Sequence, residues 1–411
     1  QISTDYADPD GVDRGSTLPT KVTMPGVTRL VYRNARGWLT QASVTGGDQT
    51  ITQRYEYDVR GAVREFVGTT GKRSLVTYDA LGRPLTQTDP EQNVTRLAYD
   101  HRDNVVRVTD ARNNSTTMVY DRRNKLLSET NPLGLATRYE YDPAGRMTKL
   151  IRPSGVSITL VYDNGGRVLQ RIARRADGTV ESTDQFTWDP SGNMTAWSNA
   201  EASAVLAYDD NNLLLSEAVT RNGVTLTRSY TYYANKQIRT YTGPDGVTVQ
   251  YVYNRNGQLD KIEIPGVGAI SVTNRQWLSP TEVVYPGGSR LKIVRDAFGD
   301  AVDVNLTSPG QVERFSQFYQ RGPRGELLQR RTDGRTTAFT YDDNLQLQGV
   351  DASGFGNDQD FTLDPVGNRE TQNGVSGEWQ YDAANRLLSR GTVTYGYDDD
   401  GNLVVKTDTA L

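Results

Sequence analysis

The dipeptide Tyr-Asp recurs at a fixed spacing, and this repeat constrains the fold more than any other feature of the sequence. It occurs at Tyr57, Tyr78, Tyr99, Tyr120, Tyr141 and Tyr162, each 21 residues after the one before. Further copies, with substitutions or a changed spacing, lie at Tyr32-Arg33, Trp188-Asp189, Tyr208-Asp209, Tyr232-Tyr233, Tyr253-Asn254, Tyr341-Asp342, Leu363-Asp364, Tyr381-Asp382 and Tyr397-Asp398. Periods of this length are typical of repeat proteins, in which each unit packs mainly on its neighbours.

In most of these repeats the residue three positions after the Asp position is Gly, Asn or Asp, which tolerate positive φ. Asp at the first position and Gly at the fourth are typical of a type I turn, here one that closes a hairpin with a bulge. We therefore expect structural turns at Tyr57, Asp58 and Gly61; Tyr78, Asp79 and Gly82; Tyr99 and Asp100; Tyr120 and Asp121; Tyr141, Asp142 and Gly145; Tyr162, Asp163 and Gly166; Tyr381 and Asp382; and Tyr397, Asp398 and Gly401.

Apolar residues alternate before each turn, as at Tyr139 and Tyr141, and return five positions after the Asp, as at Met147. This period of two predicts strands with one buried face. A second turn signal, such as the segment 131–134, closes each repeat. The predicted fold class is all-β: a long antiparallel meander of hairpins. Because a meander of about thirty strands cannot stay flat, we expect it to curl into a hollow shell or spiral.

The register of the repeat divides the chain into four segments. We expect lead-in strands over residues 1–31, regular repeats over 32–258, degenerate repeats over 259–340 and recognisable repeats again over 341–411. All four are predicted to form one continuous shell domain, because a repeat this short buries its apolar face only by packing on the next.

The composition excludes several classes of chemistry. The chain has no cysteine and a single histidine, His101, so it has neither a thiolate nucleophile nor a Cys or multi-His metal site. The 46 basic and 50 acidic residues are interspersed, and no basic stripe indicates nucleic-acid binding. No apolar run is long enough for a membrane helix. The chain begins at Gln1 without a signal peptide, and we interpret it as an internal piece of a longer protein.

Each candidate site also has a structural explanation. The Asp ladder, densest at Asp8-Pro9-Asp10-Gly11-Val12-Asp13 and Asp398-Asp399-Asp400-Gly401, could ligate calcium, but most repeats offer one Asp that the turn already explains. His101 falls within a turn, Gly287-Gly288 is expected to be a turn and not a phosphate loop, and Asp142-Pro143 and Asp364-Pro365 lie in repeat register. We therefore predict no catalytic, cofactor-binding or metal residues and no cofactor, and we expect that the chain is not an enzyme.

Three segments carry a family resemblance. Residues 141–146, 78–83 and 381–386 closely resemble the YD repeat, Y-D-x-x-G-R-L, of the Rhs family, which also occurs in the B and C components of insecticidal Tc toxins and in teneurins. The resemblance covers about residues 32–411. It implies a large hollow β-shell that, in bacterial members, encloses a toxic C-terminal domain before delivery, commonly by type VI secretion. The R-Y-Y-D-P-x-x-G-R-F-like segment of the family's closing, self-cleaving region is not found here, nor is a delivery or toxin domain.

The resemblance gives the leading functional hypothesis. The chain is expected to be a structural segment of a cocoon that encapsulates and shields a polymorphic toxin domain, used in interbacterial competition. The implied partners are the enclosed toxin domain and the rest of the shell of the same gene product, with secretion-apparatus proteins as further candidates. The implied location is that of a bacterial effector made in the cytoplasm and then secreted or delivered. The alternative is an adhesion or carbohydrate-binding surface protein, as the resemblance to teneurins allows.

Overall fold

The computed structural model describes residues 3–5, 20–24, 26–353, 358–375 and 379–408. These residues form strands joined by tight turns, with one 3-10 turn at Pro286–Gly288. Within these ranges, no helix has the length and apolar character needed to cross a membrane. The expectation of an all-β chain is confirmed.

The strands are short, between three and nine residues each. The first group is β1 (Ser3–Asp5), β2 (Lys21–Met24), β3 (Val27–Arg33), β4 (Leu39–Gly46), β5 (Gln49–Tyr57), β6 (Val63–Val67), β7 (Arg73–Tyr78), β8 (Pro84–Thr88), β9 (Val94–Tyr99), β10 (Val105–Thr109), β11 (Ser115–Tyr120), β12 (Leu126–Thr130) and β13 (Ala136–Tyr141). The second is β14 (Met147–Ile151), β15 (Ser157–Tyr162), β16 (Val168–Arg174), β17 (Val180–Trp188), β18 (Met194–Ser198), β19 (Ala202–Tyr208), β20 (Leu214–Arg221), β21 (Val224–Tyr232), β22 (Ile238–Thr242), β23 (Thr248–Tyr253), β24 (Leu259–Ile264), β25 (Gly268–Gln276) and β26 (Ser279–Val284). The third is β27 (Arg290–Arg295), β28 (Ala301–Thr307), β29 (Glu313–Arg321), β30 (Leu327–Thr332), β31 (Arg335–Tyr341), β32 (Leu347–Asp351), β33 (Gln359–Leu363), β34 (Arg369–Gln372), β35 (Trp379–Tyr381), β36 (Leu387–Arg390), β37 (Val393–Tyr397) and β38 (Leu403–Asp408).

Strands that follow one another in the chain pair side by side and antiparallel, which is the predicted meander. In the hairpin of β13 and β14, for example, Tyr139 lies opposite Leu150, and the register shifts between Glu140 and Tyr141 as a bulge requires. Among the described residues, 34 strands belong to one sheet and β35–β38 to another. The predicted fold class, a long antiparallel meander of hairpins, is therefore confirmed.

The two faces of the sheet differ in polarity because side chains alternate along each strand. On β9, Leu97 and Tyr99 are half-buried on one face, whereas Arg96 and Ala98 are exposed on the other. We call the first face, which carries the tyrosines, the aromatic face. The polar face carries cross-strand pairs such as Thr77 and Thr86, whose hydroxyls lie 2.6 Å apart.

Few side chains are buried completely. Among the described residues, the buried apolar side chains are Val27, Val31, Ala204 and Phe361, each at most 6% exposed. The tyrosines and aliphatic residues of the aromatic face instead pack along the sheet, as where the rings of Tyr55 and Phe66 lie 5.3 Å apart on neighbouring strands. The core is a thin layer spread over one face.

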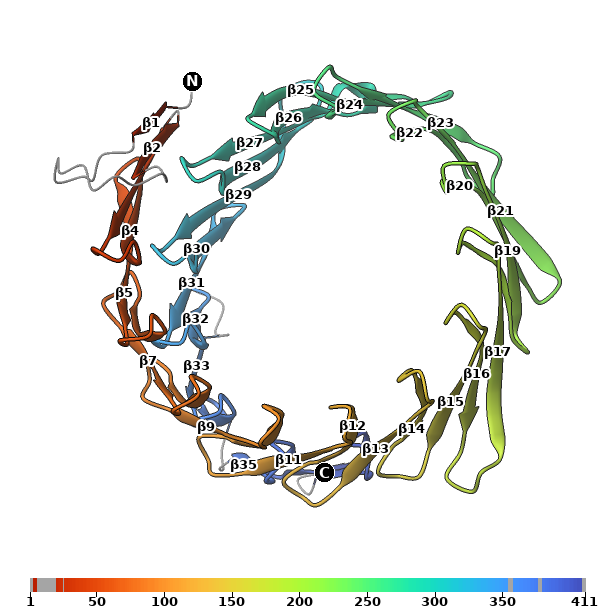
Figure 1. The fold of residues 1–411 in the computed structure, drawn as a ribbon. Coiled ribbons are helices and arrows are strands. Elements are labelled where there is room, and N and C mark those ends of the chain that lie inside the picture. The colour runs from red at the N-terminus through yellow and green to blue at the C-terminus, as the bar shows by residue number, and fades with distance from the viewer. Residues whose placement is uncertain (1–2, 6–19, 25, 354–357, 376–378, 409–411) are drawn as a thin grey trace. The chain divides into compact units, whose positions relative to one another are not determined.

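The chain divides into two compact units. The first comprises Gln1–Thr117, Leu291–Gly396 and Val405–Leu411, and the second comprises Met118–Arg290 and Tyr397–Val404. Within the first unit, turns that lie far apart in sequence meet: the turns that lead into β7 and β9 contact the turn that leads into β32 through Lys72 and Asp343 and through Asp89 and Asn344, and Figure 1 labels these strands.

Candidate functional site

The Tyr-Asp turn is the feature repeated most often in the structure. At Asp142, the N–H of Gly145 donates to the Asp142 carbonyl (2.9 Å), and the N–H of Asp142 donates to the carbonyl of Arg146 (3.0 Å). Gly145 has φ +82°, a conformation that an L side chain rarely adopts. These two bonds close a three-residue hairpin loop with a bulge. A loop of this geometry reverses the chain and still matches the twist of the two strands that it joins.

The Asp side chain closes the same loop from within. Oδ1 of Asp79 accepts the N–H groups of Leu81 and Arg83, both at 2.9 Å. Its Oδ2 accepts Nε of Arg83 at 2.7 Å. Asp suits this position because its short side chain carries two acceptor oxygens. These oxygens accept hydrogen bonds from donors that the turn would otherwise leave unpaired.

These contacts lower the pKa of the turn aspartates. The pKa of Asp79 lies below its ordinary value mainly because its carboxylate accepts the N–H of Arg83, with the Arg83 guanidinium adding to the effect. The direction is the same, with the hydrogen bond from the fourth residue after the Asp as the main cause, at Asp58, Asp100, Asp121, Asp142, Asp163, Asp189 and Asp398.

The tyrosine of the motif ties its strand to the preceding repeat. The hydroxyl of Tyr78 donates to the carbonyl of Val63 (2.7 Å), and that of Tyr141 donates to the carbonyl of Leu126 (3.0 Å). Burial is the main reason that the pKa of Tyr141 is raised. The same bond to the start of an earlier returning strand is made by Tyr57, Tyr162, Tyr232, Tyr341 and Tyr381, and by the indole N–H of Trp188.

The arginine that follows the glycine ties each turn to the next one. Nη1 of Arg146 donates to the carbonyl of Asp163 (3.0 Å), and its guanidinium lies 4.9 Å from the ring centre of Tyr162. Arg83 makes the same two contacts with Asp100 and Tyr99. We call this contact the arginine latch. Its consequence is that each guanidinium holds three groups: its own Asp, the next turn and the next tyrosine.

Repeats without this arginine reach the next turn in other ways. Arg60 and Arg123, two residues after the Asp, donate to carbonyls of the following turn at 2.9 and 3.0 Å. Asn193 takes the arginine position and donates to Oδ1 of Asn212 at 2.8 Å. The sequence shows Arg83 and Arg146 only as part of the motif and does not predict the arginine latch. The available signal is an Arg two or four residues after many of the turn aspartates, as at Arg60 and Arg83.

The candidate residues outside the repeats do not come together. Asp8, Asp10 and Asp13 lie outside the described residues. In the part of the chain that the structure describes, no three His, Cys, Asp or Glu side chains gather closely enough to hold a metal ion. Asp400 instead accepts the N–H and the hydroxyl of Ser154 at 3.0 and 2.7 Å.

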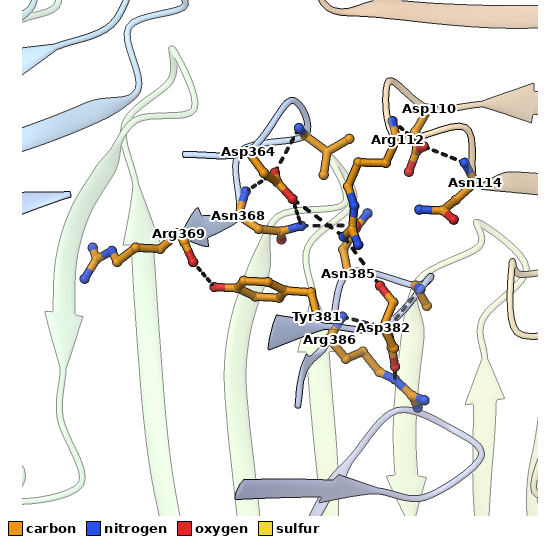
Figure 2. A network of polar contacts seen from close by, with 12 residues as sticks. Asp110, Arg112, Asn114, Asp364, Asn368, Arg369, Tyr381, Asp382, Asn385 and Arg386 are labelled. Atoms are coloured by element: carbon orange, nitrogen blue, oxygen red, sulfur yellow. Dashed lines mark hydrogen bonds and ion pairs between the residues drawn. The ribbon is translucent and has the colours of Figure 1, made fainter. Parts of the chain in front are cut away.

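The remaining candidates also occupy turns. His101 is exposed directly after Asp100, and Gly288 donates its N–H to the carbonyl of Tyr285 (3.0 Å). Asp142 and Asp364 each open a turn, and Figure 2 shows Asp364 accepting from Asn368 beside the bond from Tyr381 to the carbonyl of Arg369. Asp142 and Asp364 thus hold their own turns, whereas Asp400 holds a second turn at Ser154, and this arrangement can brace a sheet.

The tyrosine bond yields a test of that bracing. Tyr141→Phe leaves the ring in place but removes the donor to Leu126, which should cost about 1 kcal/mol and raise amide exchange in β12 and β13 about fivefold. Tyr139→Phe is the matched control, because the Tyr139 hydroxyl makes no hydrogen bond within the described residues. Hydrogen exchange read by mass spectrometry measures both variants, and equal rates would contradict the role assigned to Tyr141.

Comparisons with known proteins agree with this geometry. A family model described as the teneurin YD-shell matches residues 27–183 and 178–367. Double-stranded DNA deaminase toxin A of Burkholderia cenocepacia is 36% identical over 87 residues, which are 21% of this chain and 6% of that protein.

Solved structures show the same fold at low sequence identity. The chain of TcdB2-TccC3 without its hypervariable C-terminal region gives a TM-score of 0.56 at 14% identity, covering 100% of this chain and 29% of that chain. A Tc holotoxin pore from Photorhabdus luminescens gives a TM-score of 0.50 at 14% identity, covering 99% of this chain and 29% of that one. The present chain therefore spans less than a third of each of these relatives.

Proposed function

The chain belongs to the teneurin YD-shell family, and from this premise we propose that it is a wall segment of an Rhs-type cocoon. In this proposal, the cocoon encloses and shields a C-terminal toxin domain before delivery to a target cell. The enclosed domain and the rest of the shell are parts of the same gene product, and secretion-apparatus proteins are further partners. The chain itself carries out no reaction.

The observation that carries the proposal is the unequal pair of sheet faces. Leu97 and Tyr99 on the aromatic face are only half-buried, and among the described residues the fully buried apolar side chains are few. A half-covered apolar face can lie against another polypeptide and remove apolar surface from water on both sides. The opposite face carries hydroxyl pairs such as Thr77 and Thr86 together with exposed aliphatic side chains such as Val119 and Val205.

The turns support the same role. Oδ2 of Asp142 accepts Nε of Arg146 at 2.6 Å, and Oδ1 of Asp142 accepts the backbone N–H of Arg146. Nη1 of Arg146 donates to the carbonyl of Asp163, so both charged groups take part in the contact between neighbouring repeats. Successive contacts of this kind stiffen the sheet along its length. The wall of a shell needs such stiffness. The sequence similarity to a deaminase toxin of Burkholderia cenocepacia supports a toxin as the enclosed domain.

The test is limited proteolysis of the longer polypeptide that the proposal implies. We expect its toxin domain to survive a protease dose that degrades the same domain expressed alone. Adding residues 1–411 as a separate chain should leave that domain unprotected, because the proposal requires the rest of the shell. Equal cleavage of the toxin domain inside and outside the polypeptide would refute encapsulation, and protection by residues 1–411 alone would refute the role as one segment of a larger wall.

The alternative, a carbohydrate-binding surface, has one observation in its favour. A groove of about 530 Å³ in the first unit is lined by Trp38, Tyr55 and Tyr57 together with Arg36 and Glu56. Aromatic rings beside polar groups are typical of ligand sites. Titration with a panel of oligosaccharides, followed by the fluorescence of Trp38 against a Trp38→Phe control, would decide between the two functions.

A further inference from the structure

One turn in the degenerate segment closes like a Tyr-Asp turn but carries different side chains. It joins β29 to β30 (Figure 1), and there the N–H of Gly322 donates to the carbonyl of Glu326 (2.8 Å) and the N–H of Gly325 donates to that of Gly322 (3.0 Å). Gly325 has φ +84°, as the bulge of such a loop requires. The backbone is therefore that of a Tyr-Asp turn, although Gly322 stands at the Asp position and Glu326 at the position of the latch arginine.

The carboxylate of Glu326 folds back into the space of the missing Asp side chain. A Cβ built on Gly322 would overlap Oε1 of Glu326. Oε2 of Glu326 accepts the N–H of Arg324 at 2.8 Å, which is the bond that Oδ1 of Asp79 accepts from Leu81 in an ordinary turn. The Glu326 side chain is only 8% exposed, so its charge depends on the donors of this turn.

The arginine of this turn has also changed place, and it stands two residues after the Asp position. Nη1 of Arg324 donates to the carbonyl of Asp343 in the following turn (2.9 Å), as Arg60 and Arg123 donate to the turns that follow them. Nε of Arg324 lies 3.5 Å from Oε1 of Glu326. The turn therefore keeps a carboxylate, a guanidinium and a link to the next turn, all supplied from other positions.

The next tyrosine supports the same interpretation. The hydroxyl of Tyr341 donates to the carbonyl of Leu327 (2.9 Å), as the tyrosines of the regular repeats do. Burial is the main reason that the pKa of Tyr341 is raised, and the charge of Glu326 adds to the effect. At Tyr141 the added charge is that of Asp121, the Asp of the preceding turn. Glu326 thus acts on the next tyrosine as the turn Asp does in a regular repeat.

We propose that Glu326 is the positioning carboxylate of this turn and that Gly322 must stay small so that Glu326 can occupy the Asp site. Neither position can then change alone to the residue common in other repeats. Gly322→Asp places a second carboxylate in an occupied space, and Glu326→Arg leaves the N–H of Arg324 without its acceptor and adds a like charge beside that guanidinium. This exchange keeps neighbouring repeats linked in a segment where the motif is degenerate, and the inference does not rest on the proposed function.

The two changes made together should restore an ordinary turn. The φ of Gly322 is not positive, so the backbone itself accepts Asp once Glu326 is removed. In the double variant G322D/E326R, the new Asp can accept the N–H groups of the loop, and the new Arg stands at the latch position that Arg146 occupies in its own turn. The two substitutions are therefore expected to compensate each other and not to add.

The test measures hydrogen exchange in β29 and β30 of the whole chain by mass spectrometry. Gly322→Asp and Glu326→Arg should each raise exchange about tenfold, whereas G322D/E326R should stay within about twofold of wild type. Glu326→Gln keeps an acceptor but loses the charge, so its exchange should lie between wild type and Glu326→Arg. Gly310→Asp is the matched control and should match wild type, because a Cβ on Gly310, in the turn that leads into β29, meets no atom within 4 Å.

Two results would overturn the proposal. If Gly322→Asp exchanges as slowly as wild type or more slowly, Glu326 does not occupy the Asp site. If the effects of the two single changes add in the double variant, the two positions have not exchanged roles. Circular dichroism shows whether each variant keeps its β-structure, and a single variant that loses it leaves the recovery in G322D/E326R as the deciding measurement.

Discussion

Replacing Asp142 by Ala should destabilise its hairpin, because the N–H of Arg146 loses a charged acceptor and the Arg146 guanidinium loses its partner. The loss should be local, since each repeat contacts mainly its neighbours. Hydrogen exchange in β13 and β14 should rise by about one to two orders of magnitude, because these strands are joined by the turn that Asp142 closes. Exchange in β20 and β21 should not change.

Asp142→Asn is the control for this change. The amide oxygen can still accept the N–H of Arg146 but the negative charge is lost, so this variant should fall between wild type and Asp142→Ala. The hydrogen bond from Arg146 lowers the pKa of Asp142 in the folded chain. Its ionisation therefore adds stability above the pKa of the unfolded chain, and this stability is lost as the pH falls through the lower folded pKa. The advantage of wild type over Asp142→Asn should accordingly shrink in acid, and an advantage independent of pH would contradict the role given to the carboxylate.

The second large effect is expected at Gly145. Its φ of +82° is strongly disfavoured for a β-branched residue, so Gly145→Val should cost about 2–3 kcal/mol. A Cβ there would also lie 3.1 Å from Cε of Lys125, but that flexible side chain can move away, so the strain lies mainly in the backbone. Urea denaturation and hydrogen exchange in β13 and β14 measure the loss.

Ala144→Val provides the comparison at the neighbouring position. Ala144 is exposed and its φ is not positive, so the same larger side chain should change the free energy of unfolding by no more than about 0.5 kcal/mol. If the two variants unfold at the same urea concentration, the hairpin does not depend on the positive φ of Gly145.

The turns and strands could be predicted from sequence because their causes are local. The carboxylate of Asp142 and the positive φ of Gly145 act within one loop, and the alternation of Tyr139 and Tyr141 reports one buried face. Even in residues 259–340, the turn at Asp296 is closed by the N–H of Gly299 (3.1 Å). There the residue before the Asp is Arg295, so a search for Tyr-Asp passes over the turn although its backbone chemistry is unchanged.

The joints between repeats needed the structure. Nη1 of Arg146 reaches the carbonyl of Asp163, and the hydroxyl of Tyr141 reaches that of Leu126, so each contact joins residues 15 to 17 positions apart. These two contacts form only because each hairpin lies beside the next one in a fixed arrangement. The sequence shows that Arg and Tyr recur, but it does not show which acceptor each of them meets.

The sequence by itself determined the hairpin, its register and the apolar face, since turn chemistry and a period of two act over a few residues. Only the tertiary structure decided which distant turns of the chain contact one another. Arg112 and Asn385 are 273 residues apart, and no periodicity in the chain predicts that they meet. The physical reason is that each strand is rotated slightly relative to its neighbour. These rotations add up over many strands before distant turns come within reach. Their sum, and not any single motif, therefore decides which turns contact each other.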